Sequence, residues 1–213
     1  MDQYAIIGNP VQHSLSPTIH KIFAEQTDQI IAYTRIKAPI DRFADTVNHF
    51  ISQGGKGCSI TLPFKEAAYQ LATTHSSTAK AAGAANTLIV KGNHEIYADN
   101  TDGPGLIQDL TNNHHYCLQQ KNILIIGAGG VVREIIQPLL SRAPRQLHIA
   151  NRTPEKAYQL ANDFKAYGNI KGWALDDIPP EPVDLMINAT SASVSGQVPD
   201  ISSKSIGKQT WCY

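Results

Sequence analysis

Residues 122–140, NILIIGAGGVVREIIQPLL, lead from an apolar run through four small residues into an amphipathic segment. The run at 122–126 predicts a buried strand, and the apolar spacing after it predicts a helix over 131–141. Gly127-Ala128-Gly129-Gly130 predicts a tight turn between them. Glycines let a backbone approach a pyrophosphate, which the N–H groups and dipole of the following helix attract. The stretch therefore favours a dinucleotide site, with a turn that binds no ligand as the alternative.

Two further strands complete half of a dinucleotide-binding fold. The pattern predicts strands over 146–150 and 183–187, with a helix over 154–164 between them. In NAD-binding proteins an acidic residue ends the second strand and binds the ribose 2′-hydroxyl. Here Asn151-Arg152-Thr153 stands at that point, where Arg152 can form a charge-assisted fork with a 2′-phosphate. The sequence therefore favours NADP over NAD, unless Arg152 is only an exposed residue at a helix start.

The first hundred residues also alternate apolar runs with helical patterns, which predicts a mostly parallel α/β sheet with helices on its faces. Ser16 is the expected N-cap of the first helix, with Pro17 at the first helical position. A polar stretch at 111–121 separates this half from the second, so we place a domain boundary between residues 112 and 113. The expected strands are 4–7, 30–37 and 58–62. Apolar residues from Ile40 to Ile51 predict a second helix, closed by Gly54-Gly55, and 87–90 and 95–98 are expected to form a hairpin through Gly92-Asn93.

Charge and composition exclude several classes of protein. The 213 residues include 18 Lys and Arg against 18 Asp and Glu, so no basic excess favours nucleic acid. The longest apolar or glycine run, 123–132, is too short for a membrane span. Cys58, Cys117 and Cys212 have neither disulfide-framework nor metal-ligand spacing. We expect a cytoplasmic protein with reduced thiols and no metal, membrane or nucleic-acid partner.

Two segments of the first half carry side chains suited to a small carboxylate and to proton transfer. Ser14-Leu15-Ser16-Pro17 places two hydroxyls near a helix start, where donors and the helix dipole suit a carboxylate. The alternative is that Ser16 is a simple N-cap. Thr61-Leu62-Pro63-Phe64-Lys65 places a lysine beside apolar residues, which lower a lysine pKa and favour a role as a base. Most lysines at helix starts are merely solvated.

Asparagine and aspartate flank the expected hairpin. Asn86-Thr87 begins it, and Asn100-Thr101-Asp102-Gly103 follows it. Clustered Asn and Asp before Gly usually form a turn. Together with the serines and the lysine, they instead converge on one site for a polyol that carries a carboxylate.

The order of the motifs along essentially the whole chain resembles that of the shikimate dehydrogenase family. The motifs are Gly8-Asn9-Pro10, Ser14-x-Ser16-Pro17-x-x-His20, Thr61-Leu62-Pro63-x-Lys65, Gly83-Ala84-Ala85-Asn86-Thr87, Asn100-Thr101-Asp102-Gly103, Gly127-Ala128-Gly129-Gly130, Asn151-Arg152-Thr153 and Asn188-Ala189-Thr190-Ser191. The resemblance implies reversible NADP-dependent reduction of 3-dehydroshikimate to shikimate, on the route to chorismate and the aromatic amino acids. It also implies a substrate-binding catalytic domain at 1–112, a Rossmann-like NADP-binding domain at 113–213, and a monomer or homodimer.

The resemblance further implies a role for each matching residue. Lys65, with Asp102 beside it, handles the proton on the reacting oxygen. The hydride chemistry belongs to the cofactor, so the protein contributes orientation and proton transfer. By this resemblance Ser14 and Ser16 bind the substrate carboxylate, and the ring hydroxyls are bound by Thr61, Asn86 and Asp102. The cofactor pyrophosphate is bound by Gly127, Ala128, Gly129 and Gly130, and its 2′-phosphate by Asn151, Arg152 and Thr153.

Three features depart from the family pattern. Ser59 stands where the family usually has Asn, from which we expect a modest effect. Val132 and Glu134 replace small residues after the glycine turn, from which we expect weaker NADP binding. Family members continue beyond the position of Tyr213, so the resemblance implies that a C-terminal segment is lacking, and residues 210–213 are expected to begin a strand.

Two other functions compete with the leading one. The first is a dehydrogenase of broader specificity that also acts on quinate. The second is a non-catalytic, ligand-binding remnant that keeps the motifs without turnover.

Overall fold

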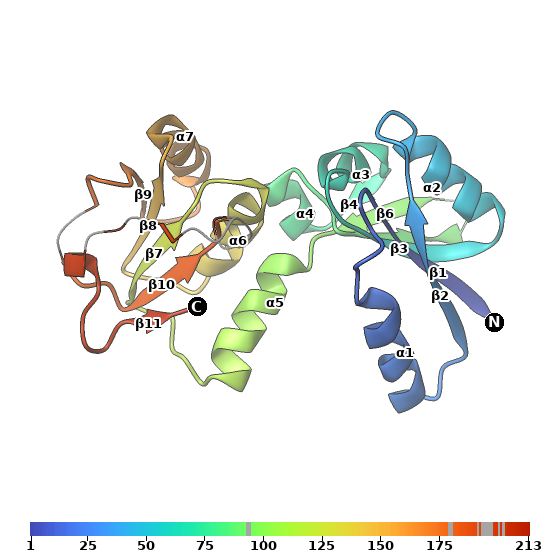
Figure 1. Ribbon diagram of the computed structural model, residues 1–213, viewed down its shortest axis with the longest axis horizontal. Coiled ribbons are helices and arrows are strands. Elements are labelled where there is room, and N and C mark those ends of the chain that lie inside the picture. Colours follow the sequence, from blue (N-terminus) through green and yellow to red (C-terminus); the bar gives the residue numbers. More distant parts are fainter. Residues whose placement is uncertain (93–94, 179–180, 191, 193–197, 200, 202) are drawn as a thin grey trace. The chain divides into compact units, whose positions relative to one another are not determined.

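The structure is a computed structural model that describes residues 1–92, 95–178, 181–190, 192, 198–199, 201 and 203–213 (Figure 1). Asn93 of the predicted hairpin turn and Ser191 of the motif at 188–191 lie outside these ranges.

The chain divides into two compact units, Met1–Thr101 and Asp102–Tyr213. The expected boundary lay later in the chain, between residues 112 and 113. Helix α5 (Asp102–Gln108) belongs to the second unit because it packs closely on helix α6 (Gly130–Leu140). A Cβ atom at Gly103 would lie 2.6 Å from the carbonyl oxygen of Glu134. The chain continues after α5 as a π-helix, η2 (Asp109–Asn113), which takes in the first three residues of the polar stretch 111–121 that suggested a linker.

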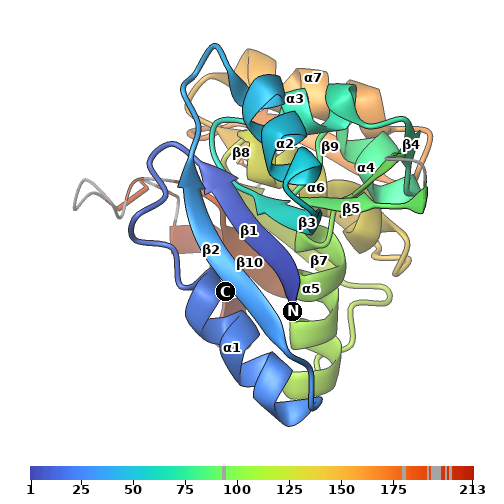
Figure 2. The ribbon, with the colours of Figure 1, turned by 90° about the vertical axis from the view of Figure 1, so that its right-hand side faces the viewer.

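The first unit holds a six-stranded sheet in the order β2-β1-β3-β5-β6-β4. Strand β1 pairs in parallel with both β2 and β3, which flank it in Figure 2, whereas β5 is antiparallel to β3 and to β6. The hairpin prediction is therefore confirmed. The elements are β1 (Asp2–Gly8), α1 (Ser16–Gln26), β2 (Ile31–Lys37), α2 (Phe43–Ser52), β3 (Gly55–Ile60), α3 (Lys65–Leu71), β4 (Thr74–His75), α4 (Ser77–Ala82), β5 (Thr87–Val90) and β6 (Ile96–Asp99).

The core of the first unit lies between the sheet and helices α2 and α3. Alternate residues of β1 and β3, such as Ile7 and Ile60, point into it because successive side chains of a strand face opposite sides. Val47 and Phe50 of α2 and Ala68 of α3 cover them. Helix α1 packs along β2, and Ala24 is its one buried residue.

The start of α1 differs from the expectation. Ser16 is the first helical residue rather than the N-cap, a position that Leu15 occupies without a side-chain bond. The hydroxyl that serves this end belongs to Ser14, whose Oγ accepts a hydrogen bond from the Ser16 N–H at 3.2 Å. The structure thus shifts the capping role by two residues and leaves the Ser16 hydroxyl outside it.

The second unit holds a five-stranded, all-parallel sheet in the order β11-β10-β7-β8-β9. The apolar strand β7 lies at its centre and is buried from Ile123 to Ile126, and α6 and α7 supply further buried residues. The predicted strand–turn–helix is therefore confirmed. The elements are β7 (Asn122–Ile126), α6, β8 (Gln146–Asn151), α7 (Pro154–Phe164), β9 (Ile170–Ala174), β10 (Leu185–Asn188), the 3-10 helix η4 (Ser203–Ser205) and β11 (Trp211–Cys212).

The last residues form a strand, as expected. β11 pairs in parallel with β10. The Tyr213 hydroxyl donates to a carboxylate oxygen of Asp109 at 2.8 Å. Bonds from the Asn113 side chain and from Tyr213 lower the pKa of Asp109, because they stabilise its charged form.

Candidate active site

The loops that follow β1 and β3 are bound to each other at the carboxyl ends of these strands. The Asn9 N–H donates to the carbonyl of Leu62 at 2.9 Å, and the Asn9 amide donates to the carbonyl of Ala38, also at 2.9 Å. Gly8 packs against the methyl group of Thr61 so closely that a Cβ atom would not fit. The loop leading to Ser14 is therefore fixed against the loop that carries Thr61.

Two serine hydroxyls lie together at the start of α1. Ser14 Oγ donates to Ser16 Oγ at 3.1 Å, and both residues are half-buried. Arg35 of β2 donates to the Ser14 carbonyl oxygen from Nε at 2.9 Å and from Nη2 at 2.7 Å. Paired hydroxyls beside the first turn of a helix suit a carboxylate. Sequence reasoning missed Arg35, because no local pattern links it to a serine 21 residues earlier.

Thr61 and Lys65 flank a short turn between β3 and α3. The Phe64 N–H donates to the Thr61 carbonyl at 3.1 Å, and the buried Phe64 ring stacks on Phe43 with centroids 4.8 Å apart. Lys65 is the half-buried first residue of α3, and its carbonyl accepts from the Ala85 N–H at 2.9 Å. This packing places Lys65 beside the loop that leads to Asn86.

Asn86 lies between the ends of β3 and β6. Its carbonyl accepts from the Ile60 N–H at 2.7 Å, and its own N–H donates to the Asp99 carbonyl at 3.1 Å. Its side-chain oxygen accepts from the Thr101 N–H at 3.1 Å. Main-chain bonds thus place the loops that carry Thr61, Lys65 and Asn86 next to one another, with the serine pair on the adjoining loop. That their side chains share one site stays a prediction.

Asp102 opens the second unit as the half-buried first residue of α5. It follows Thr101 directly in the chain, whereas Lys65 belongs to the first unit. The pairing of Lys65 with Asp102 therefore stays a prediction.

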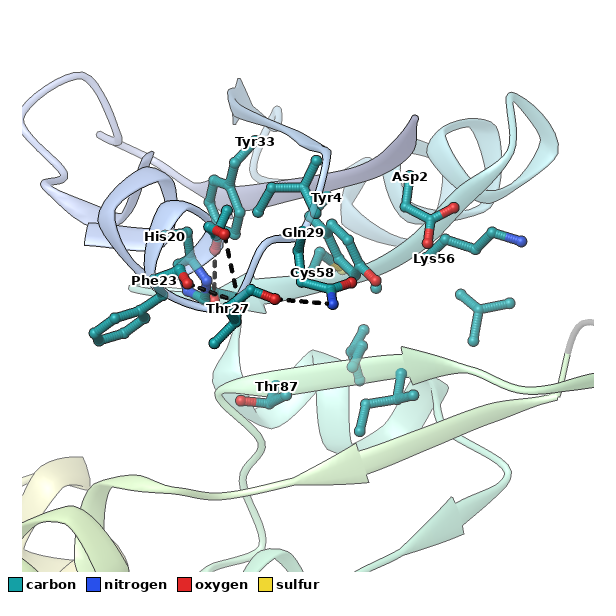
Figure 3. Close-up of a pocket in the computed structure, with 17 residues that line it drawn as sticks. Asp2, Tyr4, His20, Phe23, Thr27, Gln29, Tyr33, Lys56, Cys58 and Thr87 are labelled. Atoms are coloured by element: carbon teal, nitrogen blue, oxygen red, sulfur yellow. Dashed lines mark hydrogen bonds between the residues drawn. The ribbon is translucent and has the colours of Figure 1, made fainter. Parts of the chain in front are cut away.

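A cavity of about 630 Å³ lies on the face of the first sheet opposite α2 and α3 (Figure 3). Its lining includes Ser59, which accepts a 2.7 Å hydrogen bond from the Tyr33 hydroxyl, and His20, which stacks on Tyr33 at 4.2 Å. Burial raises the pKa of Tyr33 and lowers that of His20. Ser59, which stands where the family usually has Asn, is therefore held by Tyr33, 26 residues earlier in the chain.

The turn between β7 and α6 has the shape that a pyrophosphate requires. Gly127 has a φ of +113°, and a Cβ atom there would lie 2.9 Å from the Ala189 carbonyl oxygen. A Cβ atom at Gly129 or Gly130 would have no atom of the described residues within 4 Å, so this part of the chain leaves space beside the first turn of α6. Within the described part of the chain no side chain caps this helix end, whose N–H groups therefore suit an anion. The residues present fit a dinucleotide phosphate.

Val132 points into the interior of the second unit and is fully buried. Glu134 is also buried. The interior thus accommodates the bulk of both side chains, and their predicted effect on NADP affinity stays a prediction.

The expected 2′-phosphate residues lie at the end of β8. Asn151 closes this strand and donates from its amide to the Thr153 carbonyl at 2.9 Å, which shapes the turn into α7. Arg152 and Thr153 are exposed in this turn. An exposed guanidinium next to a helix start fits a phosphate dianion, and no acidic residue stands in the turn.

Other ligand classes find less support in the described part of the chain. No group of three His, Cys, Asp or Glu side chains within it is placed to hold a metal ion. Among the helices of that part, none has both the length and the apolar character that a membrane crossing needs.

Family models match both halves of the chain. A model described as the shikimate dehydrogenase substrate binding domain matches residues 6–88. A second, described as shikimate / quinate 5-dehydrogenase, matches residues 106–196.

Individual relatives and solved structures point to the same family as the two family models. A protein of Coxiella burnetii (strain Dugway 5J108-111) named shikimate dehydrogenase (NADP(+)) is 50% identical over 100% of this chain and 78% of its own length. The crystal structure of an Ael1 enzyme from Pseudomonas putida has a TM-score of 0.91 and 37% identity, over 99% of this chain and 76% of its own. The shikimate 5-dehydrogenase of Thermus thermophilus, in complex with NADP(H) and shikimate, has a TM-score of 0.84 and 26% identity, over 100% and 77%. With this identity over its full length, the chain belongs to the shikimate dehydrogenase family.

Proposed function

We propose that this protein catalyses the reversible, NADP-dependent reduction of 3-dehydroshikimate to shikimate, a step of aromatic amino acid biosynthesis. The observation that supports the proposal is that main-chain bonds hold the loops carrying Thr61, Lys65 and Asn86 next to one another at the strand ends of the first unit. The glycine turn of the second unit supports it, as does the family to which the chain belongs.

The substrate side follows from the chemistry of each group. Ser14 and Ser16 offer two adjacent hydroxyls to the substrate carboxylate. Thr61, Asn86 and Asp102 offer hydroxyl, amide and carboxylate groups to the ring hydroxyls. These groups hold the ring in one orientation, which converts binding energy into a faster reaction.

Lys65 is the acid/base group of the proposal. Oxidation of a carbinol requires loss of the hydroxyl proton as carbonyl character develops, and the reverse reaction returns it. A neutral lysine Nζ accepts that proton, and an ammonium donates it. Asp102 is proposed to fix the lysine head and to bind a ring hydroxyl.

When bound, NADP⁺ would accept the hydride from shikimate, and NADPH would supply it to 3-dehydroshikimate. In the proposal Gly127, Ala128, Gly129 and Gly130 lie against its pyrophosphate. Asn151, Arg152 and Thr153 surround the 2′-phosphate, where Arg152 supplies the positive charge.

Spectrophotometric detection of NADPH formation from shikimate and NADP⁺ tests the proposal. We expect turnover with NADP⁺ at micromolar to millimolar KM, the usual range for enzymes. A folded sample that binds shikimate without turnover would reject the enzyme in favour of a ligand-binding remnant.

Arg152→Ala tests the cofactor assignment. We expect a higher KM for NADP⁺ and little change in the KM for NAD⁺, because only NADP⁺ carries the 2′-phosphate that the guanidinium contacts. Steady-state kinetics with each cofactor measure the two constants. An equal loss with both cofactors would show that Arg152 does not contact this phosphate.

Quinate is a second candidate substrate, because the family model over residues 106–196 describes both shikimate and quinate dehydrogenases. Comparison of kcat/KM for quinate and shikimate decides between them. We also propose a cytoplasmic monomer or homodimer. Cys58, Cys117 and Cys212 are all free, which suits a reducing compartment, and sedimentation measures the oligomeric state.

A further inference from the structure

We infer that Arg35 is a positioning residue that holds the Ser14–Ser16 hydroxyl pair against the sheet and makes this pair select a carboxylate over an uncharged group. The inference rests on the proposed function and adds a role for a residue outside the expected site.

Arg35 of β2 attaches the loop that carries Ser14 to the sheet. Its Nε and Nη2 both donate to the Ser14 carbonyl oxygen, at 2.9 Å and 2.7 Å. The other hydrogen bonds that residues 12–16 form within the described chain are local, such as those from the Ser14 N–H to the Val11 carbonyl at 3.1 Å and from the Ser16 N–H to Ser14 Oγ at 3.2 Å. A guanidinium only donates and a carbonyl only accepts, so the direction of both bonds from Arg35 is fixed. Arg35 therefore supplies the hydrogen bonds that tie Ser14 to β2.

A neighbouring contact places Arg35 on the correct face of β2. Alternate residues of a strand share a face, so Tyr33 and Arg35 point to the same side of the sheet. The Tyr33 ring stacks on His20, which lies one turn after Ser16 on α1, with ring centroids 4.2 Å apart (Figure 3). Two adjacent contacts thus join β2 to the segment 14–20, and the serine pair lies at the one made by Arg35.

The hydroxyl pair keeps one proton for a ligand. Ser14 and Ser16 share a single hydrogen bond between their Oγ atoms, at 3.1 Å. Whichever serine donates, this bond uses one of the two hydroxyl protons, and the described residues provide no acceptor for the other. The pair therefore offers an O–H donor at the first turn of α1, where the helix dipole also favours an anion.

Arg35 adds a positive charge at the same place. In the described part of the chain no carboxylate forms an ion pair with its exposed guanidinium. The guanidinium is bound to the residue that carries one of the two hydroxyls, so it attracts a negative group at this pair more than a neutral group of similar shape. The fixed loop and the charge together favour a carboxylate, although Arg35 itself acts through Ser14.

The test compares shikimate with methyl shikimate, which has the same ring and hydroxyls but an uncharged ester. The readout is the ratio of kcat/KM for shikimate to kcat/KM for the ester. Arg35→Met keeps an apolar stem and removes the charge and the donors, so we expect this ratio to fall about tenfold, the effect of one lost hydrogen bond of a charged group. Arg35→Lys keeps the charge but cannot form the fork, so it should recover only part of the ratio. The KM for NADP⁺ should stay unchanged in both variants.

Arg42→Met is the matched control. It removes another exposed arginine of the first unit, at the start of α2, where the side chain caps no helix bond. The ratio should therefore keep its wild-type value in this variant.

An unchanged ratio in Arg35→Met overturns the inference, whether the variant handles both ligands normally or loses both equally. A wild-type ratio in Arg35→Lys also overturns it, because the fork would then have no role, and so does an equal fall in Arg42→Met. Calorimetric titration with both ligands repeats the comparison without turnover. An inactive wild type that binds shikimate would reject the proposed function while the Arg35 comparison stays decisive, and a wild type that binds neither ligand would reject both.

Discussion

Lys65 follows Phe64, whose ring stacks on Phe43, and it begins α3 with its side chain half-buried. Because its proposed role is played in the transition state, Lys65→Ala should lower kcat by roughly 10²- to 10⁴-fold and leave the KM for shikimate little changed. Steady-state kinetics measure the change in kcat and in the KM for shikimate separately. Lys65→Arg keeps the positive charge but hardly releases a proton, so it should be equally slow. A near-normal kcat in either variant would remove Lys65 from the acid/base role.

Cys58 differs from the other two cysteines in its surroundings. It is buried in β3, and burial raises its pKa to about 12, whereas Cys117 and Cys212 are exposed. Since the thiolate is the reactive form, iodoacetamide at pH 8 should modify Cys117 and Cys212 and spare Cys58. Intact-mass spectrometry counts the adducts, and the denatured protein serves as the control in which all three react. Modification of Cys58 in the folded protein would contradict this expectation.

At the scale of an element, the turn between β7 and α6 contains two glycines with different constraints. Gly127 has a positive φ, and a Cβ atom there would lie 2.9 Å from the Ala189 carbonyl oxygen, so Gly127→Ala should lower both the stability, by about 1–3 kcal/mol, and the affinity for NADP⁺. Gly129 has an ordinary φ, and none of the described residues lies within 4 Å of its Cβ position, so Gly129→Ala should keep the melting temperature and weaken only NADP⁺ binding. Thermal unfolding and fluorescence titration with NADPH separate the two effects. Full affinity in Gly129→Ala would show that the cofactor does not approach this turn.

At the scale of the whole molecule, the pH dependence of stability should reflect His148. Its Nδ1 accepts from Trp173 Nε1 at 2.9 Å. Burial lowers the pKa of His148 below 6.5, and the charge of Lys171 lowers it further, whereas Glu181 opposes them. Between the folded pKa and 6.5 the unfolded chain binds more protons, so stability falls as pH drops through this range and is fully present above it. Protonation of Nδ1 also removes the bond from Trp173.

Both tryptophans, Trp173 and Trp211, lie in the second unit, so tryptophan fluorescence follows the unfolding of that unit. Denaturant unfolding of the wild type should show a free energy that falls between pH 7 and pH 5, and His148→Gln should reduce this fall. Parallel curves for the two proteins would assign the pH dependence to other groups.

The sequence by itself determined many of the elements and the identity of the chemical groups, although strand β9 (Ile170–Ala174) was not among the predicted strands. The strand–glycine–helix unit at 122–140 and the helix at 154–164 depend on local periodicity and glycine, which act over a few residues. Element ends shifted by a few residues, as for Ser16, because capping depends on which hydroxyl reaches the first turn.

Only the tertiary structure decided how these groups are held. Because Gly103 packs closely on α6, the boundary between the two units lies between Thr101 and Asp102 rather than between residues 112 and 113. The bonds from Arg35 to Ser14 and from Tyr33 to Ser59 join residues 21 and 26 positions apart. Sheet order and register create such contacts, and both come from the burial of many side chains together, so no local pattern of residues specifies them.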